Sequence, residues 1–178
     1  VGGGGKQEIS LAFIGLDKSI QKLQATLSYK PQNTTSTFEN EAVKEVAING
    51  SALIIDFKAP ENVLPNTRNS YLIYYKNNSG KVFESVSIEA RYPQNFIFVS
   101  SNVTPAKSNN TWNLGDLNPN EEGEINFFGV LKNAENANFE FDIGVRLNDK
   151  FFKVKHISSQ VSLTALPIEI NISVNNES

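Results

Sequence analysis

His156 is the only histidine in the chain, so any serine-hydrolase triad or imidazole metal site would depend on it. No nucleophile-elbow motif accompanies it, and no second residue stands at a metal-ligand spacing from it. The chain also has no cysteine, which excludes a thiolate nucleophile, a disulfide framework and cysteine-bound metals. We therefore predict a structural or surface role for His156, with no catalytic residues and no cofactor.

A second group of residues that could bind a ligand is a run of carboxylates within nine positions of one another. Their oxygens could in principle hold calcium, but their spacing matches no calcium-binding loop. Carboxylates on an exposed turn are usually solvated, so we predict no metal here. The four residues are Asp116, Glu121, Glu122 and Glu124.

Asparagine is unusually frequent, with 23 residues, and Asn-x-Ser/Thr triplets occur at about twice the frequency that the composition would give. Such triplets accept N-linked glycans on surface loops of exported proteins. The alternative is that these residue types only form turns in a loop-rich β protein. The possible acceptors are Asn33, Asn49, Asn77, Asn102, Asn109, Asn171 and Asn176.

Net charge and hydropathy exclude some partners. The formal charge is −3 and the pI is near 5.3, and there is no basic run, which argues against nucleic acid as a partner. No apolar run approaches the roughly 18 residues of a membrane span. Residues 1–5 form a glycine-rich linker, which we expect to join the chain to something upstream, such as a membrane anchor or another domain.

Residues 112–123 combine an aromatic anchor, leucines, glycines and a proline, and this composition predicts a corner of a β-sandwich. Trp112 and Leu114 lie on the same side of an extended segment. Residues 115 and 116 turn the chain, and Leu117 then packs beneath that segment. Burial of an indole in a core is worth about 3 to 5 kcal/mol relative to Ala. We therefore predict that Trp112, Leu114 and Leu117 anchor the core.

Alternating apolar and polar residues predict strands through most of the chain, with turn residues between them and no convincing helix. A change of parity between 152 and 157 predicts a β-bulge near His156. Tyr74, Phe83, Phe128 and Phe151 are out of step with their neighbours and are predicted on the outer face. The predicted strands are 8–14, 23–29, 42–48, 53–57, 71–75, 82–90, 96–99, 125–131, 139–147 and 151–163.

Several of these segments, taken in order, resemble a known family. The segments are 70–80, 86–88, 92–93, 96–101 and the corner at 112–123. Together they resemble the conserved-repeat domain of bacterial and archaeal surface proteins, known as domain of unknown function eleven, over about residues 51–165. The resemblance implies an immunoglobulin-like sandwich, arranged in tandem on exported cell-surface proteins, without a catalytic role.

The predicted organisation is therefore an all-β chain: an immunoglobulin-like antiparallel β-sandwich with an additional N-terminal β segment. Residues 6–50 form an N-terminal β extension or a partial domain, 51–165 the sandwich, and 166–178 a terminal strand. That strand could close its own sheet, begin a following repeat or be donated to a neighbour. Its alternating apolar residues are Ile168, Ile170, Ile172 and Val174.

The first functional hypothesis is a non-enzymatic structural module of a prokaryotic cell-surface protein, located outside the cell, whose partners are neighbouring domains or other copies of that protein. The second is a pilin-like filament subunit that assembles through a terminal strand, either 8–14 or 168–174. The third is an adhesin that binds a glycan or a protein through loops at one end of the sandwich, such as 100–111 or 133–138.

Overall fold

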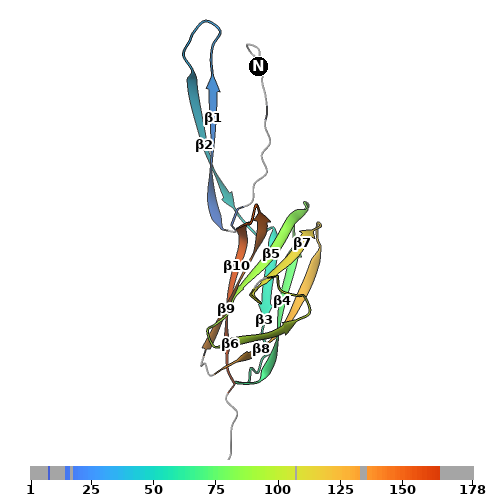
Figure 1. Ribbon diagram of the computed structural model, residues 1–178. Helices are drawn as coiled ribbons and strands as arrows, with labels where there is room; N and C mark the ends of the chain where they lie inside the picture. Colours follow the sequence, from blue (N-terminus) through green and yellow to red (C-terminus); the bar gives the residue numbers. More distant parts are fainter. Residues whose placement is uncertain (1–7, 9–14, 17, 107, 133–135, 165–178) are drawn as a thin grey trace, which may run out of the picture.

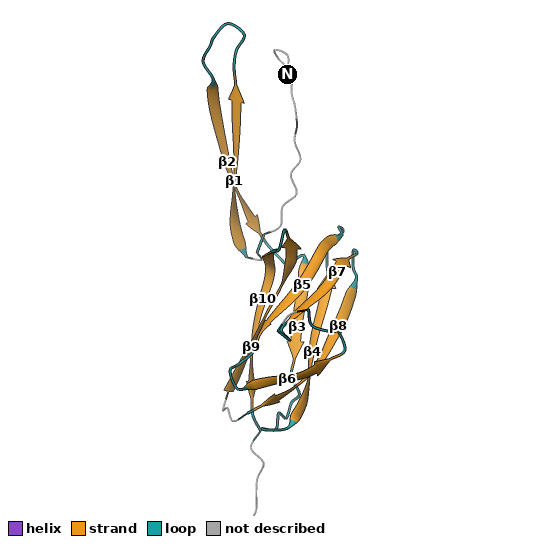
Figure 2. Ribbon diagram, viewed as in Figure 1, coloured by secondary structure: helices purple, strands orange, loops and turns teal. Residues whose placement is uncertain are grey.

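The computed structural model describes residues 8, 15, 16, 18–106, 108–132 and 136–164, and every regular element within these residues is a β-strand (Figures 1 and 2). Among them there is no helix long and apolar enough to cross a membrane. The strands are β1 (Ser19–Tyr29), β2 (Phe38–Ile48), β3 (Leu53–Lys58), β4 (Arg68–Asn77), β5 (Phe83–Arg91), β6 (Phe96–Ser101), β7 (Thr111–Leu117), β8 (Glu122–Leu131), β9 (Asn136–Leu147) and β10 (Lys150–Ser162).

Strands β3 to β10 form two four-stranded antiparallel sheets, with the orders β3-β4-β8-β6 and β10-β9-β5-β7. An immunoglobulin constant-type sandwich has sheets of order A-B-E-D and G-F-C. The chain reproduces both orders, with β7 added as an eighth strand beside β5. The fold is therefore the expected immunoglobulin-like sandwich with an additional N-terminal β segment.

An aromatic core fills the space between the two sheets. Trp112, Tyr71, Phe127, Phe139 and Phe141 are all fully buried. They come from both sheets, and their rings pack against one another, with centroids 5.2 Å apart for Tyr71 and Phe127 and 5.3 Å apart for Tyr71 and Phe139. Period-two alternation on β4, β8 and β9 places these rings on one side of each strand.

Two irregularities shift side chains away from the predicted parity. At the start of β5 the register with β7 changes between Phe83 and Val86, and Ser85 has a φ of 52°. Phe83 therefore points into the core, whereas Val82 is 50% exposed, so the predicted outward position of Phe83 is wrong. In β10 the register shift lies between Lys153 and Lys155, slightly before the predicted position at His156.

The predicted corner is a strand over most of its length. Residues Thr111–Leu117 form β7. Gly115, where a turn was predicted, lies within this strand with a φ of 79°. The reversal comes later, at residues 118–121, where the Glu121 amide donates to the Asn118 carbonyl. Glycine at 115 provides the left-handed conformation that the irregular β5–β7 pairing requires.

Strands β1 and β2 form a separate two-stranded antiparallel sheet in which Tyr29 pairs with Phe38 next to the connecting loop. This hairpin projects from one end of the sandwich (Figure 1). The predicted strands at 23–29 and 42–48 lie within it. The predicted strand at 8–14 (apart from residue 8), the glycine linker at 1–5 and the terminal strand with Ile168, Ile170, Ile172 and Val174 lie outside the described residues.

The chain enters the sandwich at one end and leaves it at the other. At the start of β3, Leu53 pairs with Asn77 at the end of β4. At the far end, Val63 forms a parallel bridge with Leu163, and the Thr164 amide donates to the Val63 carbonyl at 2.9 Å. The hairpin and the end of the described chain therefore lie at opposite ends of the sandwich (Figure 1).

Candidate functional site

A cluster of charged residues lies on the outer face of the β10-β9-β5-β7 sheet, centred on Asp142. The Asp142 side chain is only 6% exposed and interacts with three basic residues from the neighbouring strands. One carboxylate oxygen lies 2.8 Å from Arg91 Nη1, and the other lies 2.8 Å from His156 Nδ1 and 3.6 Å from Lys153 Nζ.

Cross-strand register brings these residues together. His156 on β10 is directly opposite Asp142 on β9, and Arg91 on β5 is opposite Glu140. Arg91 Nε also donates to Glu140 at 2.8 Å, and this hydrogen bond lowers the pKa of the Glu140 carboxyl. Paired groups directly opposite on one sheet face stabilise the pairing of the strands.

The cluster does not form a hydrolytic site with the serine nearest to His156 in the sequence. Ser158 donates to Asn138 at 2.8 Å, and the imidazole Nδ1 is occupied by Asp142. Within the part of the chain that the structure describes, no group of His, Asp and Glu residues is arranged to hold a metal ion. The geometry is that of a stabilising ion-pair network on a sheet surface.

Three of the four carboxylates after Trp112 have separate hydrogen-bond partners. Asp116 accepts from the Ser85 amide, and Glu121 accepts from the amide and side chain of Asn118. Glu122 accepts from Tyr74 and Lys76, and these contacts, the tyrosine hydrogen bond first, lower its pKa. The carboxylates do not converge on a common point.

Three hollows share Arg146 in their lining, and two of them lie on the same outer face. The hollow over β5 and β7, of about 390 Å³, is lined by small polar residues, including Ser85, Ser87 and Asn113. A second extends to the loop at 106–111. Arg146 itself donates to Glu89 at 2.5 Å and lies 5.6 Å from the Phe151 ring centroid. This surface could accept a polar ligand through hydrogen bonds.

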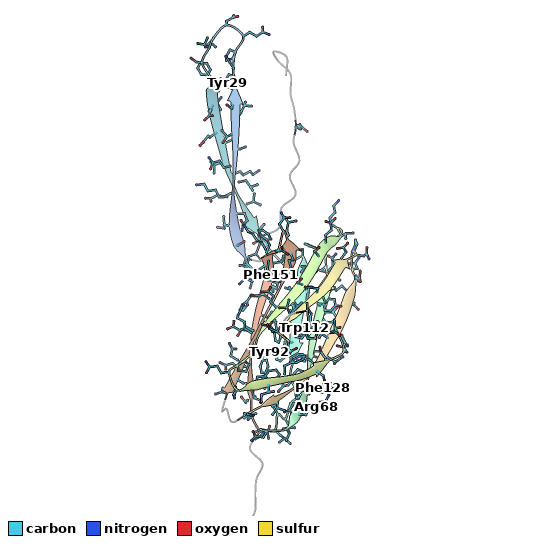
Figure 3. The ribbon with its side chains drawn as sticks, in the orientation of Figure 1. Tyr29, Arg68, Tyr92, Trp112, Phe128 and Phe151 are labelled. Atoms are coloured by element: carbon cyan, nitrogen blue, oxygen red, sulfur yellow. The ribbon has the colours of Figure 1, made fainter. Side chains whose placement is uncertain are left out.

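The aromatic and leucine residues that the sequence singled out differ in burial; Trp112, Phe128 and Phe151 are labelled in Figure 3. Trp112 is fully buried and donates through Nε1 to the Val103 carbonyl at 3.2 Å, and Leu117 is also buried. Leu114 is half-buried against the core. Phe128 and Phe151 are half-buried and lie beneath the guanidinium groups of Arg68 and Arg146, a typical cation–π arrangement.

The possible glycan acceptors divide into three groups. Asn33, Asn49, Asn102 and Asn109 are exposed. Asn171 and Asn176 lie outside the described residues. Asn77 is fully buried, and its Nδ2 donates to the carbonyls of Lys81, Leu117 and Asn118 at 2.8 to 3.0 Å, so the folded structure argues against a glycan at Asn77.

The structural role of Asn77 is not evident from the sequence, in which Asn-Asn-Ser-Gly between two strands indicates only a turn. The side-chain oxygen of Asn77 accepts from the Ser79 amide and hydroxyl, as in a local Asx turn. Its amide nitrogen reaches across to the β7–β8 turn. An asparagine at the end of a strand, just before a turn, indicates a side chain that bonds to nearby backbone. The sequence gives no indication that this side chain also bonds to a residue 40 positions away.

Comparisons with known proteins do not show a family. A scan of family models finds no match, and a search of curated proteins also finds none. The solved structure of AvmM, which catalyses macrocyclization in alchivemycin A biosynthesis, is similar at 12% identity over 68% of this chain and 94% of that chain, with a TM-score of 0.47. A PapD-like domain of human CEP192 is similar at 11% identity over 67% and 88%, with a TM-score of 0.38. At these scores neither structure carries a functional argument.

Proposed function

We propose that the protein is a non-enzymatic structural module of a prokaryotic cell-surface protein, and that it transmits tension along a chain of domains outside the cell. The observation that carries the proposal is the path of the chain, which enters the sandwich beside Asn77 and leaves it beside Val63 at the opposite end. A spacer must join its neighbours at opposite ends, whereas an isolated domain has no such requirement.

The parallel contact at the exit suits this role. Force applied at the two ends pulls Val63 and Leu163 past each other, so the bridge and the Thr164-to-Val63 hydrogen bond are loaded in shear. The β1–β2 hairpin is loaded differently, because the ends of its strands, Ser19 and Ile48, pair with each other. Its pairs open one at a time.

Two further features support a location outside the cell. Exposed Asn33, Asn49, Asn102 and Asn109 begin Asn-x-Ser/Thr triplets, and residues 51–165 resemble a repeat of exported surface proteins. The Asp142 cluster, with its carboxylate already paired to Arg91 and His156, favours a structural over a catalytic use of that sheet face.

Single-molecule force spectroscopy on residues 1–178, held at its two ends, tests the proposal. We expect a low-force opening of the hairpin followed by unfolding of the sandwich at a distinctly higher force. Thr164→Pro removes the amide that donates to Val63 and should lower the second force. Thr164→Ala keeps that amide and should leave the force unchanged. A sandwich that opens at the hairpin force, or two variants that behave alike, would contradict the proposal.

The hollows around Arg146 favour a second candidate, an adhesin that binds a polar ligand such as a glycan. They reach residues 106–111, part of the loop expected to bind ligands. Asn113→Trp would fill the hollow from β7 with an exposed side chain. If a glycan array detects binding, this variant should lose it while the melting temperature stays unchanged; binding that survives the substitution would exclude this surface.

A further inference from the structure

One face of the β1–β2 hairpin is apolar, and no sheet of the described residues covers it, although Gly15 lies against Ile48 at its base. Antiparallel pairing puts Leu23 beside Lys44, Ala25 beside Ala42 and Leu27 beside Asn40 on this face. Leu27 is 61% exposed, and Tyr29 and Phe38, which stack on each other, are 43% and 46% exposed. We call this surface the hairpin face; its apolar residues are Leu23, Ala25, Leu27, Tyr29, Phe38, Ala42, Val46 and Ile48.

The opposite side of the hairpin is predominantly polar. Lys22 lies beside Glu45, Thr26 beside Glu41 and Ser28 beside Glu39, interrupted by the apolar residues Ile20, Val43 and Ala47. An isolated two-stranded hairpin is marginally stable, and an amphipathic one requires a second layer over its apolar face. The hairpin thus has the pattern of one half of a sandwich.

The hairpin β9–β10 carries the same pattern at a constant distance along the chain. Leu23, Ala25 and Leu27 correspond to the inward-facing Phe139, Phe141 and Ile143, at an offset of about 116 positions. On the second strand, residues 42, 44, 46 and 48 correspond to 157, 159, 161 and 163, at an offset of 115 positions. Polar Lys44 even coincides with Ser159, and Val46 coincides with Val161.

The correspondence continues on both sides of the two hairpins. Upstream, residues 8–14 (EISLAFI) stand where β8 has 124–130 (EINFFGV), and both begin with Glu-Ile. Downstream, β3 stands in the position that the alternating segment 168–172 has after β10. The same order of sequence patterns therefore occurs twice: an alternating segment, a hairpin, a short linker and a second alternating segment.

The second occurrence shows what covers a face of this kind. The inward rings of β9 pack against the opposite sheet, where the Phe139 centroid lies 5.3 Å from that of Tyr71 and the Phe141 centroid lies 4.7 Å from that of Phe57. Next to β9 on the same sheet is β5. The equivalent layer and the equivalent neighbour of β1 are missing from the described part of the chain.

We propose that β1–β2 is the closing hairpin of a second sandwich of this design, and that the hairpin face binds the opposite sheet of that sandwich. The free edge of β1 then pairs with the strand equivalent to β5. In the proposed chain of domains, this second sandwich is the neighbouring domain. The inference rests on the proposed structural function only for its biological setting.

The alternating segment 168–174 of the same molecule does not fit as the covering strand. Val174 is ten residues beyond Thr164, so it reaches at most about 36 Å from that residue. To reach the hairpin from Thr164, the segment would have to run back along the whole of β10, whose 13 residues span about 43 Å. The segment therefore cannot lie along the hairpin, which projects from the far end (Figure 1).

A hairpin exchange within the full chain tests the equivalence. In the first chimera, a copy of residues 20–48 replaces residues 136–163, so that Leu23 takes the place of Phe139. In the control, residues 19–47 replace the same segment, which shifts every side chain to the other face. Both inserts have the same length. The readouts are the emission of Trp112, the only tryptophan, and the melting temperature.

We expect the first chimera to fold with Trp112 buried, at a lower melting temperature because Leu23 and Ala25 replace two phenyl rings. Changing these two residues of the insert to Phe should raise that temperature again. The control should be unfolded. The proposal is overturned if the control is as stable as the first chimera, or if the first chimera stays unfolded with both Phe residues present. The pulling experiment leaves both hairpins unaltered, so its outcome is independent of the exchange.

Discussion

Asn77 Nδ2 donates a hydrogen bond of 2.9 Å to the carbonyl of Leu117, across 40 positions of the sequence. The same nitrogen lies within 3.0 Å of the Asn118 carbonyl, while the Asn77 backbone bonds to residues 120 and 121. One buried side chain therefore joins the β4–β5 turn to the β7–β8 turn. The two turns lie at the end where the chain enters the sandwich.

Asn77→Ala should destabilise the sandwich by about 3 kcal/mol, because buried carbonyls lose their donor and each unsatisfied group costs about 1 to 3 kcal/mol. Asn77→Asp should cost more, since it puts a carboxylate against those carbonyls. Chemical denaturation measures both. Asn78→Ala, at the exposed neighbouring position, keeps its backbone bond to Ala52 and serves as the control; equal losses at 77 and 78 would contradict this role.

The folded protein, when secreted from a glycosylating host, should carry no glycan at Asn77. A glycan there would replace one of the two amide protons that donate in the turn junction, and the buried site has no room for the sugar. Exposed Asn33 and Asn49 have no such restriction. Peptide mass spectrometry on the folded fraction measures the occupancy, with Asn33 and Asn49 as internal controls. Modified Asn77 in a protein of unchanged melting temperature would disprove the prediction.

Gly144→Ala should destabilise the protein by about 1 to 3 kcal/mol, the range for an overpacked site. A Cβ at position 144 would lie 2.2 Å from the Phe152 carbonyl oxygen and 3.0 Å from Lys153 Cα, and both are backbone atoms that cannot move aside freely. Gly80→Ala is the control, because no atom lies within 4 Å of its Cβ, and it should change stability by less than about 0.5 kcal/mol. Thermal unfolding compares the two variants; a silent Gly144→Ala would contradict the close backbone approach.

Period-two alternation was sufficient to predict the sandwich, because each strand buries one face and its apolar residues must share a parity. It failed at Phe83, where the irregular pairing of β5 with β7 and the positive φ of Ser85 change the parity. Bulges depend on how the two strands meet, and a single strand's pattern contains only half of that information. For the same reason, the irregularity in β10 lies at Lys153–Lys155 and not at the predicted position near His156.

The polar interactions were less predictable than the core. Asp142, Arg91 and His156 come from three strands, and they meet only because the register of β9 with β5 and β10 places them on neighbouring positions. Each residue alone resembles an ordinary outward-facing charge. The Asn77 junction is similar, since the partner of a capping side chain is set by the packing of two distant turns.

At neutral pH, Tyr71→Phe should be as stable as the wild-type protein, or more stable by up to about 1 kcal/mol. The Tyr71 hydroxyl is buried without a hydrogen-bond partner among the described residues, so its removal avoids a desolvation cost. Burial also raises the pKa of Tyr71 to about 12 from 10.0. The native state therefore holds the phenol proton more tightly than the unfolded state does, and the stability from this group is complete below pH 10.

Between pH 10 and about 12 the unfolded chain ionises at this position while the folded chain does not, so stability falls by at most about 1.4 kcal/mol per pH unit. Tyr71→Phe should reduce this alkaline slope. Some slope should remain, because burial also raises the pKa values of Tyr75 and Tyr92. Denaturant unfolding of wild type and variant at pH 8, 10 and 11 measures the difference. Parallel curves from pH 8 to 11 would show that the hydroxyl is solvated in the folded protein.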